Sequence, residues 1–577
     1  MKLKLSDNAL RVLETRYLAK DEEGKVIETP EELFQRVAKN IASADALYGL
    51  TSEEVMQTEK FFLQSMVNLE FLPNSPTLMN AGRDLQQLSA CFVLPIEDST
   101  ESIFDAVKYT ALVHKSGGGT GFSFSRLRPK HDRVRSTGGI ASGAVSFMKV
   151  FNISTEVIKQ GGTRRGANMA ILQVNNPDIV EFITCKDDET AFTNFNISVG
   201  LTEEFMRAYK EDRDYELINP RTKESVKRIR AKEVWDLLVE MAWKNGEPGV
   251  VFLDQINEGN PTPHLGKIEA TNPCGEQPLL PYESCTLGSI NLSKMVYMNV
   301  YGEPAINYFK LREIVRLGVH FLDNVIDVNK YPLPKIEKIT KGNRKIGLGV
   351  MGFADMLIKI RVPYNSPRSL EIAEEVMSFI FQEARKKSQE LAHERGPFPN
   401  FRGSIYDKPG HPLMRNATVT TIAPTGTLSI IAGCSSGIEP LFSVAFVRNI
   451  LDNEKLFDVN PVFKKLVKSE GYYGEELIQK IIEARGSIKD LDEVPPPIKK
   501  LFVTAHEVSP HHHIQMQAIF QKYTDNAVSK TVNFPHDAPK STIDEVYRLA
   551  YELHCKGVTV YRDGSRKGQV LSTDFIT

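Results

Sequence analysis

The sequence predicts an α/β protein with a helical region at its N-terminus. Helix signals dominate residues 1–70, whereas from Phe71 onward short apolar runs broken by Gly, Asn and Pro alternate with helical stretches. Strands that alternate with helices are typical of an α/β barrel or a layered sheet. Of the 577 residues, 41% are hydrophobic and 25% are charged, which is the composition of a globular protein that buries a substantial core.

The N-terminal helices are predicted from their start signals. Pro30 stands in the first turn of one helix, followed by Glu31 and Glu32, and proline is favoured there because its missing N–H has no partner in any case. Thr51 and Glu54 form the pattern of a capping box at the start of the next helix.

Further along the chain, strands and helices are distinguished by periodicity. Strands are expected within LSACFVLPI (88–96), MAILQV (169–174) and NISVGLT (196–202). Segment 301–400 repeats apolar residues every three or four positions and is expected to form packing helices. Segment 445–500 is charged and contains Pro495–Pro497, which suggests a surface excursion before the strand-like LFVTA (501–505).

Charge and composition exclude several function classes. The 71 basic and 73 acidic residues nearly cancel, so the chain lacks the bulk field that draws proteins onto nucleic acid polymers or acidic membranes, and a nucleotide would have to bind in a local pocket. No apolar run has the length of a signal peptide or a membrane span, so we expect a cytoplasmic protein. Six cysteines without a C-x-x-C pair predict neither a disulfide scaffold nor a metal site.

The loop around Cys274 is the most informative stretch. In TNPCGE (271–276) proline and glycine predict a tight turn, which would hold the Cys274 sulfur beside the Asn272 amide and the Glu276 carboxylate. A hydrogen-bonding group and a proton acceptor close to a thiol suit catalysis. Taken alone, the stretch is equally compatible with a turn that contains an incidental cysteine.

Other motifs accompany this loop in a fixed order, between Asn74 and about Arg566. They are NSPTLMNAG (74–82), LSACFVLPIEDS (88–99), SGGGTGFSFSRLRP (116–129), ASGAVSFMKVFN (141–152), GGTRRGANMA (161–170), RKIGLGVMGFAD (344–355), APTGTLS (423–429), SKTVNFP (529–535) and GVTVYRDGSR (557–566). With the Cys274 loop, this series resembles the catalytic polypeptide of ribonucleotide reductases. The resemblance implies a ten-stranded α/β barrel of two antiparallel five-stranded halves, with the radical cysteine on a central finger loop.

The resemblance also assigns catalytic roles. Cys274 matches the cysteine that becomes a thiyl radical and abstracts the 3′-hydrogen of the ribose, Glu276 the residue that takes the 3′-hydroxyl proton, and Asn272 a hydrogen-bond donor to the sugar. Cys91 and Cys285 match the pair that supplies two reducing equivalents and ends as a disulfide. Without the surrounding motif, Cys91 would be interpreted as a buried residue of an apolar strand.

Substrate and effector sites are implied in the same way. Substrate contacts match Thr77, Ala90, Gly119 and the phosphate-binding turn Pro424, Thr425, Gly426, Thr427 and Leu428. Effector contacts match Asp98, Ser99, Arg128 and Arg135, together with Thr163, Arg164 and Arg165 of the loop Gly161–Met169 that reports the effector to the substrate. As an isolated pair, the two loop arginines would be interpreted as solvated surface charges.

The resemblance implies the following organisation and partners. An N-terminal helical region covers 1–70 and the catalytic barrel 71–577, with an effector-binding and dimerisation segment at about 98–170. Deoxynucleoside triphosphates or ATP with Mg²⁺ are the expected effectors, ribonucleoside diphosphates the expected substrates, and a homodimer the expected assembly. Residues 1–73 are too short to add the ATP-binding cone of some relatives, so we expect no on/off activity site.

The radical source is predicted from the C-terminal motif. GVTVYRDGSR has the single Tyr561 followed by Arg562, where oxygen-dependent relatives carry adjacent tyrosines, so the closest resemblance is to the adenosylcobalamin-dependent class. The alternatives are a subunit that needs a separate metal-containing radical-generating protein, and a catalytically silent nucleotide-binding protein on the same fold. No cysteine pair follows the last motif, so either the chain continues beyond Thr577 or a thioredoxin-type or other dithiol reductant acts directly.

Some conspicuous residues are assigned structural roles. His511, His512 and His513 would point in different directions on a helix, which disfavours a shared metal. Cys185, Cys434 and Cys555 have no partner spacing and are expected to be structural or surface residues.

Overall fold

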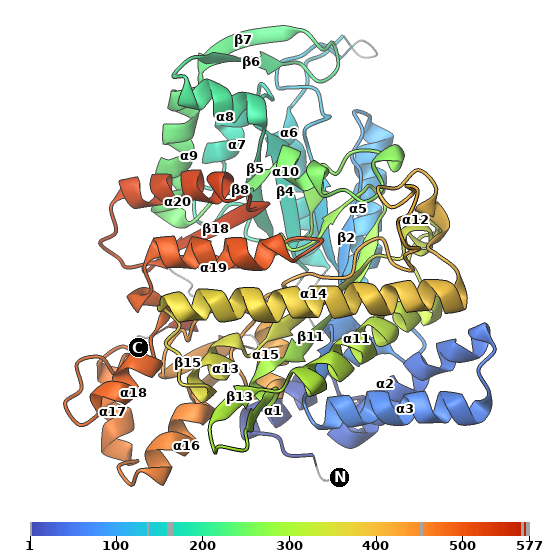
Figure 1. Ribbon diagram of the computed structural model, residues 1–577. Helices are drawn as coiled ribbons and strands as arrows, with labels where there is room; N and C mark the ends of the chain where they lie inside the picture. The colour runs from blue at the N-terminus through green and yellow to red at the C-terminus, as the bar shows by residue number, and fades with distance from the viewer. Residues whose placement is uncertain (1–2, 135–137, 159–165, 451–453, 567–570, 573–577) are drawn as a thin grey trace.

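A closed α/β barrel forms the centre of the molecule (Figure 1). The structure is a computed structural model that describes residues 3–134, 138–158, 166–450, 454–566 and 571–572. One half of the barrel contains five strands that run parallel to one another. They are β2 (Cys91–Val93), β3 (Gly119–Ser123), β4 (Asn168–Gln173), β5 (Phe195–Leu201) and β8 (Gly249–Phe252).

The second half runs antiparallel to the first and closes the ring. Its strands are β11 (Ser284–Asn291), β14 (Ile346–Met351), β17 (Thr531–Phe534) and β18 (Gly557–Arg562). β11 pairs antiparallel with β2, and β18 pairs antiparallel with β8. Parallel bridges from Leu348 to Thr420 and from Ile422 to Val528 connect β14 to the segment that leads into β17. The expected barrel of two antiparallel halves is confirmed.

Glycines in the barrel strands make room for backbone in the interior. A Cβ atom on Gly121 of β3 would lie 1.7 Å from the carbonyl oxygen of Thr271, and one on Gly349 of β14 would lie 2.3 Å from that of Thr421. No side chain fits at either position. The strands β3 and β14 are buried at every residue, as expected when both faces of a parallel sheet are covered.

The N-terminal region is helical and joins the same core as the second half of the barrel. It contains α1 (Asp7–Arg16), α2 (Pro30–Ala42), the 3-10 turn η1 (Ser43–Tyr48) and α3 (Ser52–Val67), and β1 (Phe71–Pro73) then adds to β11. The predicted proline start of α2 and the Thr51–Glu54 capping box of α3 are confirmed.

Helices cover the outside of the barrel. The long α14 crosses the face shown in Figure 1, with the N-terminal helices below it on one side and α16–α18 on the other. The remaining helices of eight residues or more are α5 (Thr100–Lys115), α6 (Ala144–Val157), α8 (Glu203–Lys210), α9 (Ala231–Asn245), α11 (Tyr308–Val328), α12 (Pro334–Asn343), α14 (Pro367–Arg395), α16 (Pro461–Ser469), α17 (Glu475–Glu483), α19 (Pro510–Lys522) and α20 (Lys540–Glu552).

Shorter elements complete the path. They are α4 (Ser75–Asn80), α7 (Ile179–Thr184), α10 (Leu253–Glu258), α13 (Phe353–Lys359), α15 (Gly426–Ala432) and α18 (Pro496–Leu501), and the hairpins β6 (Asp214–Ile218) with β7 (Ser225–Arg230), β12 (Val296–Met298) with β13 (Pro304–Ile306), and β15 (Ala445–Ile450) with β16 (Glu454–Val459). The two-residue strand β19 (Leu571–Ser572) pairs with β15.

One expected strand is absent from the described residues. LFVTA (501–505) ends α18 and contributes only an isolated bridge between Thr504 and Leu441, so the expectation of a strand there was wrong. Its apolar residues Phe502 and Val503 are buried against the core around the second half of the barrel, and burial alone accounts for the pattern.

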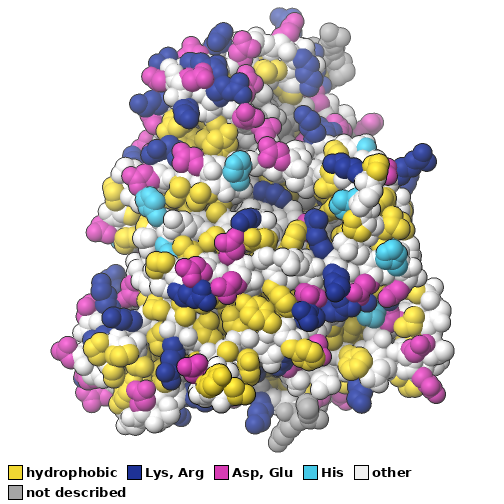
Figure 2. Space-filling model, in the orientation of Figure 1, with side chains coloured by type: hydrophobic (Ala, Val, Ile, Leu, Met, Phe, Trp, Pro, Cys, Tyr) yellow, Lys and Arg dark blue, Asp and Glu magenta, His cyan; other side chains and the backbone are white. Residues whose placement is uncertain are grey.

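Charges of both signs are interspersed on the face shown in Figure 2. Within the described residues, every helix is too short or too polar to cross a lipid bilayer.

Candidate active site

The loop that carries Cys274 is the tip of a short hairpin inside the barrel. β9 (Ala270–Thr271) pairs antiparallel with β10 (Pro278–Leu279). Across the turn, the Gly275 N–H donates to the Asn272 carbonyl over 3.0 Å, and Gly275 has a φ of 81° that favours glycine. The Gln277 N–H donates to Asn272 Oδ1 over 3.0 Å. The tight turn predicted from the sequence is therefore present.

Both halves of the barrel hold this finger loop in place. Asn196 of β5 donates through Nδ2 to the Pro273 carbonyl over 2.8 Å. From the other half, the Thr421 hydroxyl and the Ala527 N–H donate to the Glu276 carbonyl over 2.9 and 3.0 Å. The loop therefore spans the interior between the two halves, as expected of a central finger.

Cys91 and Cys285 are direct cross-strand partners. Cys91 on β2 lies opposite Cys285 in the antiparallel pairing with β11, and both are free thiols. Directly opposed residues have Cβ atoms about 4.5–5.5 Å apart, and a disulfide requires about 3.5–4.5 Å. A small adjustment would therefore allow a bond between them.

The polar groups of the finger loop converge on Cys91. Asn272 Nδ2 donates to Cys91 Sγ over 3.1 Å, and the Cys91 thiol lies 4.0 Å from Glu276 Oε1. The sequence predicted these two groups beside Cys274, which belongs to the same turn, and in the structure both groups also contact Cys91. Asn272 and Glu276 are both buried, and Cys274 is the exposed residue of the turn.

Cys285 lies deeper than Cys91. Its thiol points at the carbonyls of Thr286 and Lys345, each 3.5 Å away, and its side chain is fully buried. Burial raises the pKa of the Cys285 thiol strongly, with the Lys345 ammonium acting in the opposite direction. Cys285 is therefore held as a neutral thiol.

A cavity of about 180 Å³ opens beside the finger loop. Cys91, Asn272, Cys274 and Glu276 line it. Its other walls come from the N-terminal region, from β3 and β11, and from the turn before α15. Those residues are Arg16, Tyr17, Asn74, Ser75, Met79, Ala90, Gly118, Gly119, Ala167, Pro273, Leu287, Gly288, Ser289, Ala423, Pro424, Thr425, Gly426, Thr427 and Leu428.

Of the expected substrate contacts, all but one line this cavity. Thr77 lies behind the wall, fully buried, where its N–H and hydroxyl both donate to Asn74 Oδ1 over 2.9 Å. Arg16 and Tyr17 were missed because no motif marks the end of α1. The Tyr17 hydroxyl is 2.8 Å from Ser75 Oγ, which connects α1 to the cavity wall.

The Pro424–Leu428 turn has the geometry of a helix start. Thr425 adopts a left-handed φ of 53° at the N-cap of α15, and its hydroxyl oxygen accepts from the Gly437 N–H over 2.8 Å. The first turn of a helix directs N–H groups that lack carbonyl partners within the helix. Since this turn lines the cavity, those N–H groups are positioned to meet an anion.

The expected effector residues fall into two groups. Asp98 accepts from Arg128 Nε over 2.8 Å, and the adjacent Ser99 caps α5, so these three residues lie together. Arg135, Thr163, Arg164 and Arg165 lie outside the described residues. The described end of the loop Gly161–Met169 runs from Gly166, which packs against His114 of α5, to Ala167 at the cavity.

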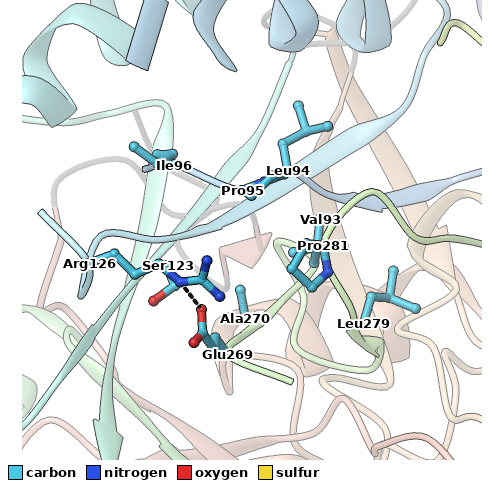
Figure 3. A pocket seen from close by; sticks show the side chains of 10 residues that line it. All are labelled: Val93, Leu94, Pro95, Ile96, Ser123, Arg126, Glu269, Ala270, Leu279 and Pro281. Atoms are coloured by element: carbon cyan, nitrogen blue, oxygen red, sulfur yellow. Dashed lines mark hydrogen bonds and ion pairs between the residues drawn. The ribbon is translucent and has the colours of Figure 1, made fainter. Parts of the chain in front are cut away.

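An ion-pair bridge connects the effector segment to the base of the finger. Arg126 pairs with Glu97, next to Asp98, and its Nε donates over 2.9 Å to Glu269, which immediately precedes β9. Figure 3 shows Arg126 and Glu269 at a small hollow between β2 and the finger hairpin. No motif signal in the sequence pointed to Glu269.

The histidine run has structural partners. His512 Nε2 is 2.7 Å from the Tyr364 carbonyl, and His513 Nε2 is 3.1 Å from the Ala505 carbonyl. Burial lowers the pKa of both imidazoles.

Comparisons with known proteins agree on one family. A family model described as "Ribonucleotide reductase, barrel domain" matches residues 89–414 and 410–561, and one described as "Ribonucleotide reductase, all-alpha domain" matches 3–86. The chain is 53% identical to a vitamin B12-dependent ribonucleoside-diphosphate reductase of Thermoplasma acidophilum, over 99% of this chain and 80% of the relative. It is 47% identical to one of Mycobacterium tuberculosis, over 99% and 79%.

Among solved structures, the alpha subunit of the class Id ribonucleotide reductase of Actinobacillus ureae superposes with a TM-score of 0.78. The match covers 97% of each chain at 23% sequence identity, so it bears on the fold alone.

Proposed function

The chain belongs to the ribonucleotide reductase family, and we propose that it converts ribonucleoside diphosphates to 2′-deoxyribonucleoside diphosphates with adenosylcobalamin as its radical source. The observation that carries this function is the grouping of three cysteines, two that line one cavity and a third that lies directly behind its wall. Cys274 is exposed at the finger tip, Cys91 lies beside Asn272 and Glu276, and Cys285 lies opposite Cys91 on the neighbouring strand.

The residues divide the reaction among them. The Cys274 sulfur, as a radical, takes the 3′-hydrogen of the ribose, while Glu276 accepts the 3′-hydroxyl proton. The 2′-hydroxyl then leaves as water. Cys91 and Cys285 together supply two electrons and two protons and become a disulfide, and Cys274 returns its hydrogen to C3′.

Asn272 has to change partners during this sequence. Its amide donates to the Cys91 sulfur in the structure, so a bond to a ribose hydroxyl requires the amide to turn away from that sulfur. The backbone of Asn272 is held meanwhile, because its carbonyl accepts from the Gly275 N–H and its N–H donates to the Gln277 carbonyl. The side chain can therefore exchange one donor bond without movement of the loop.

The cofactor follows from the relatives and from the position of Cys274. When bound, adenosylcobalamin supplies the one-electron chemistry that no side chain generates alone. Cys274 fits it because this cysteine is exposed at an open cavity, where a group docked at the mouth would face the sulfur. The relatives at 47–53% identity carry vitamin B12 dependence in their names, which favours this source over a separate radical-generating subunit.

We assign the substrate phosphates to the turn Pro424–Leu428. Its first-turn N–H groups suit an anion, and it lies across the cavity from the finger. We propose that Ala90, just before β2, and Gly119 of β3 contact the substrate, since both line the cavity. Thr77 acts behind the wall by fixing Asn74.

Asp98, Ser99 and Arg128 are proposed to hold a deoxynucleoside triphosphate or ATP with Mg²⁺. Arg135, Thr163, Arg164 and Arg165 would complete this effector site. Support comes from the path of the loop, whose described end links α5 to the cavity. We place the effector-binding and dimerisation segment at about 98–170.

A homodimer is proposed through α5 and α6. On these helices the side chains of Phe104, Leu112, Ile153 and Val157 are between 42% and 77% exposed. Large apolar side chains exposed to water are typical of a protein–protein contact surface. Sedimentation velocity with and without effector tests the assembly, and a monomer under both conditions would contradict it.

We propose that residues 1–70 form a helical region and that residues 71–577 form the catalytic barrel. We also propose that the protein works in the cytoplasm. None of the six cysteines is joined in a disulfide in the structure, and the proposed chemistry consumes thiols, which suits a reducing compartment with a thioredoxin-type or other dithiol reductant.

The deciding experiment is turnover of the purified chain with a ribonucleoside diphosphate and dithiothreitol, with and without adenosylcobalamin. Deoxynucleotide formation only in the presence of the cofactor is the expected result. Activity that arises only when a metal-loaded second protein is added would favour the separate-subunit alternative. Product formation under either condition would exclude a catalytically silent protein.

A further inference from the structure

The two thiols of the reducing pair differ in their access to the cavity. Cys91 lines the cavity and is 3% exposed, whereas Cys285 is not part of the cavity wall and is 0% exposed. Carbonyls of Thr286 and Lys345 lie 3.5 Å from the Cys285 sulfur. Both thiols belong to one apolar cluster of the barrel interior, so contact with the cavity is what distinguishes them.

From this asymmetry we infer that re-reduction of the Cys91–Cys285 disulfide has a fixed direction: the incoming thiol attacks Cys91 Sγ, and Cys285 is the leaving group. The inference rests on the proposed role of this pair. A thiolate must approach a sulfur with access, and exchange proceeds through a mixed disulfide with the sulfur that is attacked. The cavity borders Cys91, whereas Cys285 lies on the neighbouring strand, outside the cavity wall. An incoming thiol can therefore reach only Cys91.

The exchange balances as two steps. A thiolate of an external dithiol forms a bond to Cys91 Sγ, the Cys91–Cys285 bond breaks, and the electron pair leaves on Cys285. The second thiol of the dithiol then loses its proton, attacks the sulfur of the first, and releases Cys91. The two protons of the dithiol end on the two cysteines, which are reduced while the dithiol is oxidised.

The pKa of the leaving thiol would favour attack on the other sulfur, but access to the sulfur has the larger effect. Burial raises the pKa of Cys285, which disfavours its departure as a thiolate, although the nearby Lys345 ammonium reduces this penalty. A poorer leaving group slows an attack, whereas a fully covered sulfur cannot be attacked at all. Access therefore determines which of the two sulfurs accepts the incoming thiol.

The test maps the mixed disulfide directly. In the full chain carrying Cys274→Ala, which removes the exposed third thiol of the site, diamide oxidises Cys91 and Cys285 to the disulfide. A short pulse of the monothiol 2-mercaptoethanol, which has no second thiol to resolve the mixed disulfide within one molecule, is stopped with acid before a second molecule reacts. Free thiols are then alkylated with N-ethylmaleimide in denaturant, and peptide mass spectrometry locates both labels.

We expect the mercaptoethanol adduct on Cys91 and N-ethylmaleimide on Cys285, in at least tenfold excess over the reverse. The same pulse in guanidinium chloride, where the fold no longer covers Cys285, should label both sulfurs comparably. An adduct on Cys285, or equal labelling in the folded protein, overturns the direction of attack alone. Failure of Cys91 and Cys285 to form a disulfide at all overturns the pair assignment, and the inference with it.

Discussion

The three cysteines of the site differ in how far each side chain reaches the cavity, and their roles follow that order. Cys274 is exposed at the finger tip, Cys91 lines the wall beside Asn272, and Cys285 is covered. The exposed sulfur is the one that we expect an external radical source to reach, whereas Cys91 faces the cavity and Cys285 is reached only through Cys91.

Substitution of these cysteines by serine should therefore give two different failures. Cys274→Ser removes the sulfur that abstracts hydrogen, so neither deoxynucleotide nor free base should form. Cys285→Ser leaves abstraction intact but removes one of two reducing equivalents, so the base should be released without deoxynucleotide. Chromatography of the products under dithiothreitol measures both, and Cys185→Ser, outside the site, serves as the control. Normal deoxynucleotide from Cys274→Ser would show that the radical assignment is wrong.

The resemblance to the family paired Cys91 with Cys285, whereas local sequence patterns gave no sign of their contact. Their opposition depends on the register between β2 and β11, which are far apart in the chain and meet only when the barrel closes. The same limit applies to Asn272, because the contact of its amide with Cys91 joins the finger to a strand of the wall. Local patterns predicted the turn, and long-range packing determined what the turn touches.

At the scale of elements, the finger hairpin depends on the absence of a side chain at Gly121 of β3. A methyl group on Gly121 would lie 1.7 Å from the backbone oxygen of Thr271, and a backbone atom cannot move aside as a flexible side chain can. Gly121→Ala should therefore displace the finger.

We expect Gly121→Ala to lower the free energy of unfolding by about 1–3 kcal/mol. It should also reduce kcat about 100-fold, because misplacement of reacting groups by about 1 Å has an effect of that order. Urea unfolding followed by circular dichroism and steady-state turnover measure the two effects. Gly474→Ala, where a Cβ atom would meet nothing within 4 Å, is the matched control. Unchanged turnover in Gly121→Ala would contradict the placement of the finger.

The loop Gly161–Met169 is the second element with a testable role. Its described end reaches from α5 to the cavity, so an effector held near Asp98 and Ser99 can change the shape of the substrate site. Different deoxynucleoside triphosphates should therefore change which ribonucleotide is reduced fastest. Coupling between two sites is typically about 1–3 kcal/mol, enough for a preference switch of about 5- to 150-fold. Competition assays with mixed substrates measure it, and the same product distribution under all effectors would refute the coupling.

On the scale of the whole molecule, a buried charge network ties the N-terminal helices to the barrel. Asp323 of α11 pairs with Arg344, Arg395 and Arg415, and Arg395 also pairs with Asp45 of η1. All five side chains are at most 6% exposed.

The barrel and its N-terminal helices could be predicted from the family motifs and helix-start signals, but this network could not. In sequence, Arg344 and Arg415 look like ordinary solvated arginines, and only the meeting of α11 with distant segments buries them. Periodicity also failed at LFVTA (501–505), where apolar residues are buried without pairing as a strand. Sequence patterns predict which residues are buried and where turns form, whereas the partners of buried charges depend on tertiary packing.

The network should make stability depend on pH in the acid range. Burial alone would raise the pKa of Asp323, but the three guanidinium groups outweigh it and lower the pKa to about 2. In the unfolded chain an aspartate titrates near about 3.9. A carboxyl whose pKa is lowered by folding stabilises the protein above its unfolded pKa, and this contribution is lost as the pH falls from about 4 toward about 2.

Asp323→Asn isolates that contribution, because asparagine keeps the shape but not the charge. At pH 7 the variant should be about 3–5 kcal/mol less stable than the wild type, since it takes the anion from buried Arg415 and leaves Arg344 and Arg395 with only one anion each. The difference should shrink as the pH is lowered through 4, because Asp323 of the unfolded wild type then binds a proton, while the folded carboxylate keeps its charge down to about pH 2. Urea unfolding at pH 7, 5 and 3 measures it. Glu371→Gln removes an exposed partner of Arg368, so it should change stability by less than about 1 kcal/mol at every pH. A gap between Asp323→Asn and wild type that stayed constant from pH 7 to pH 3 would mean that the Asp323 charge does not stabilise the fold.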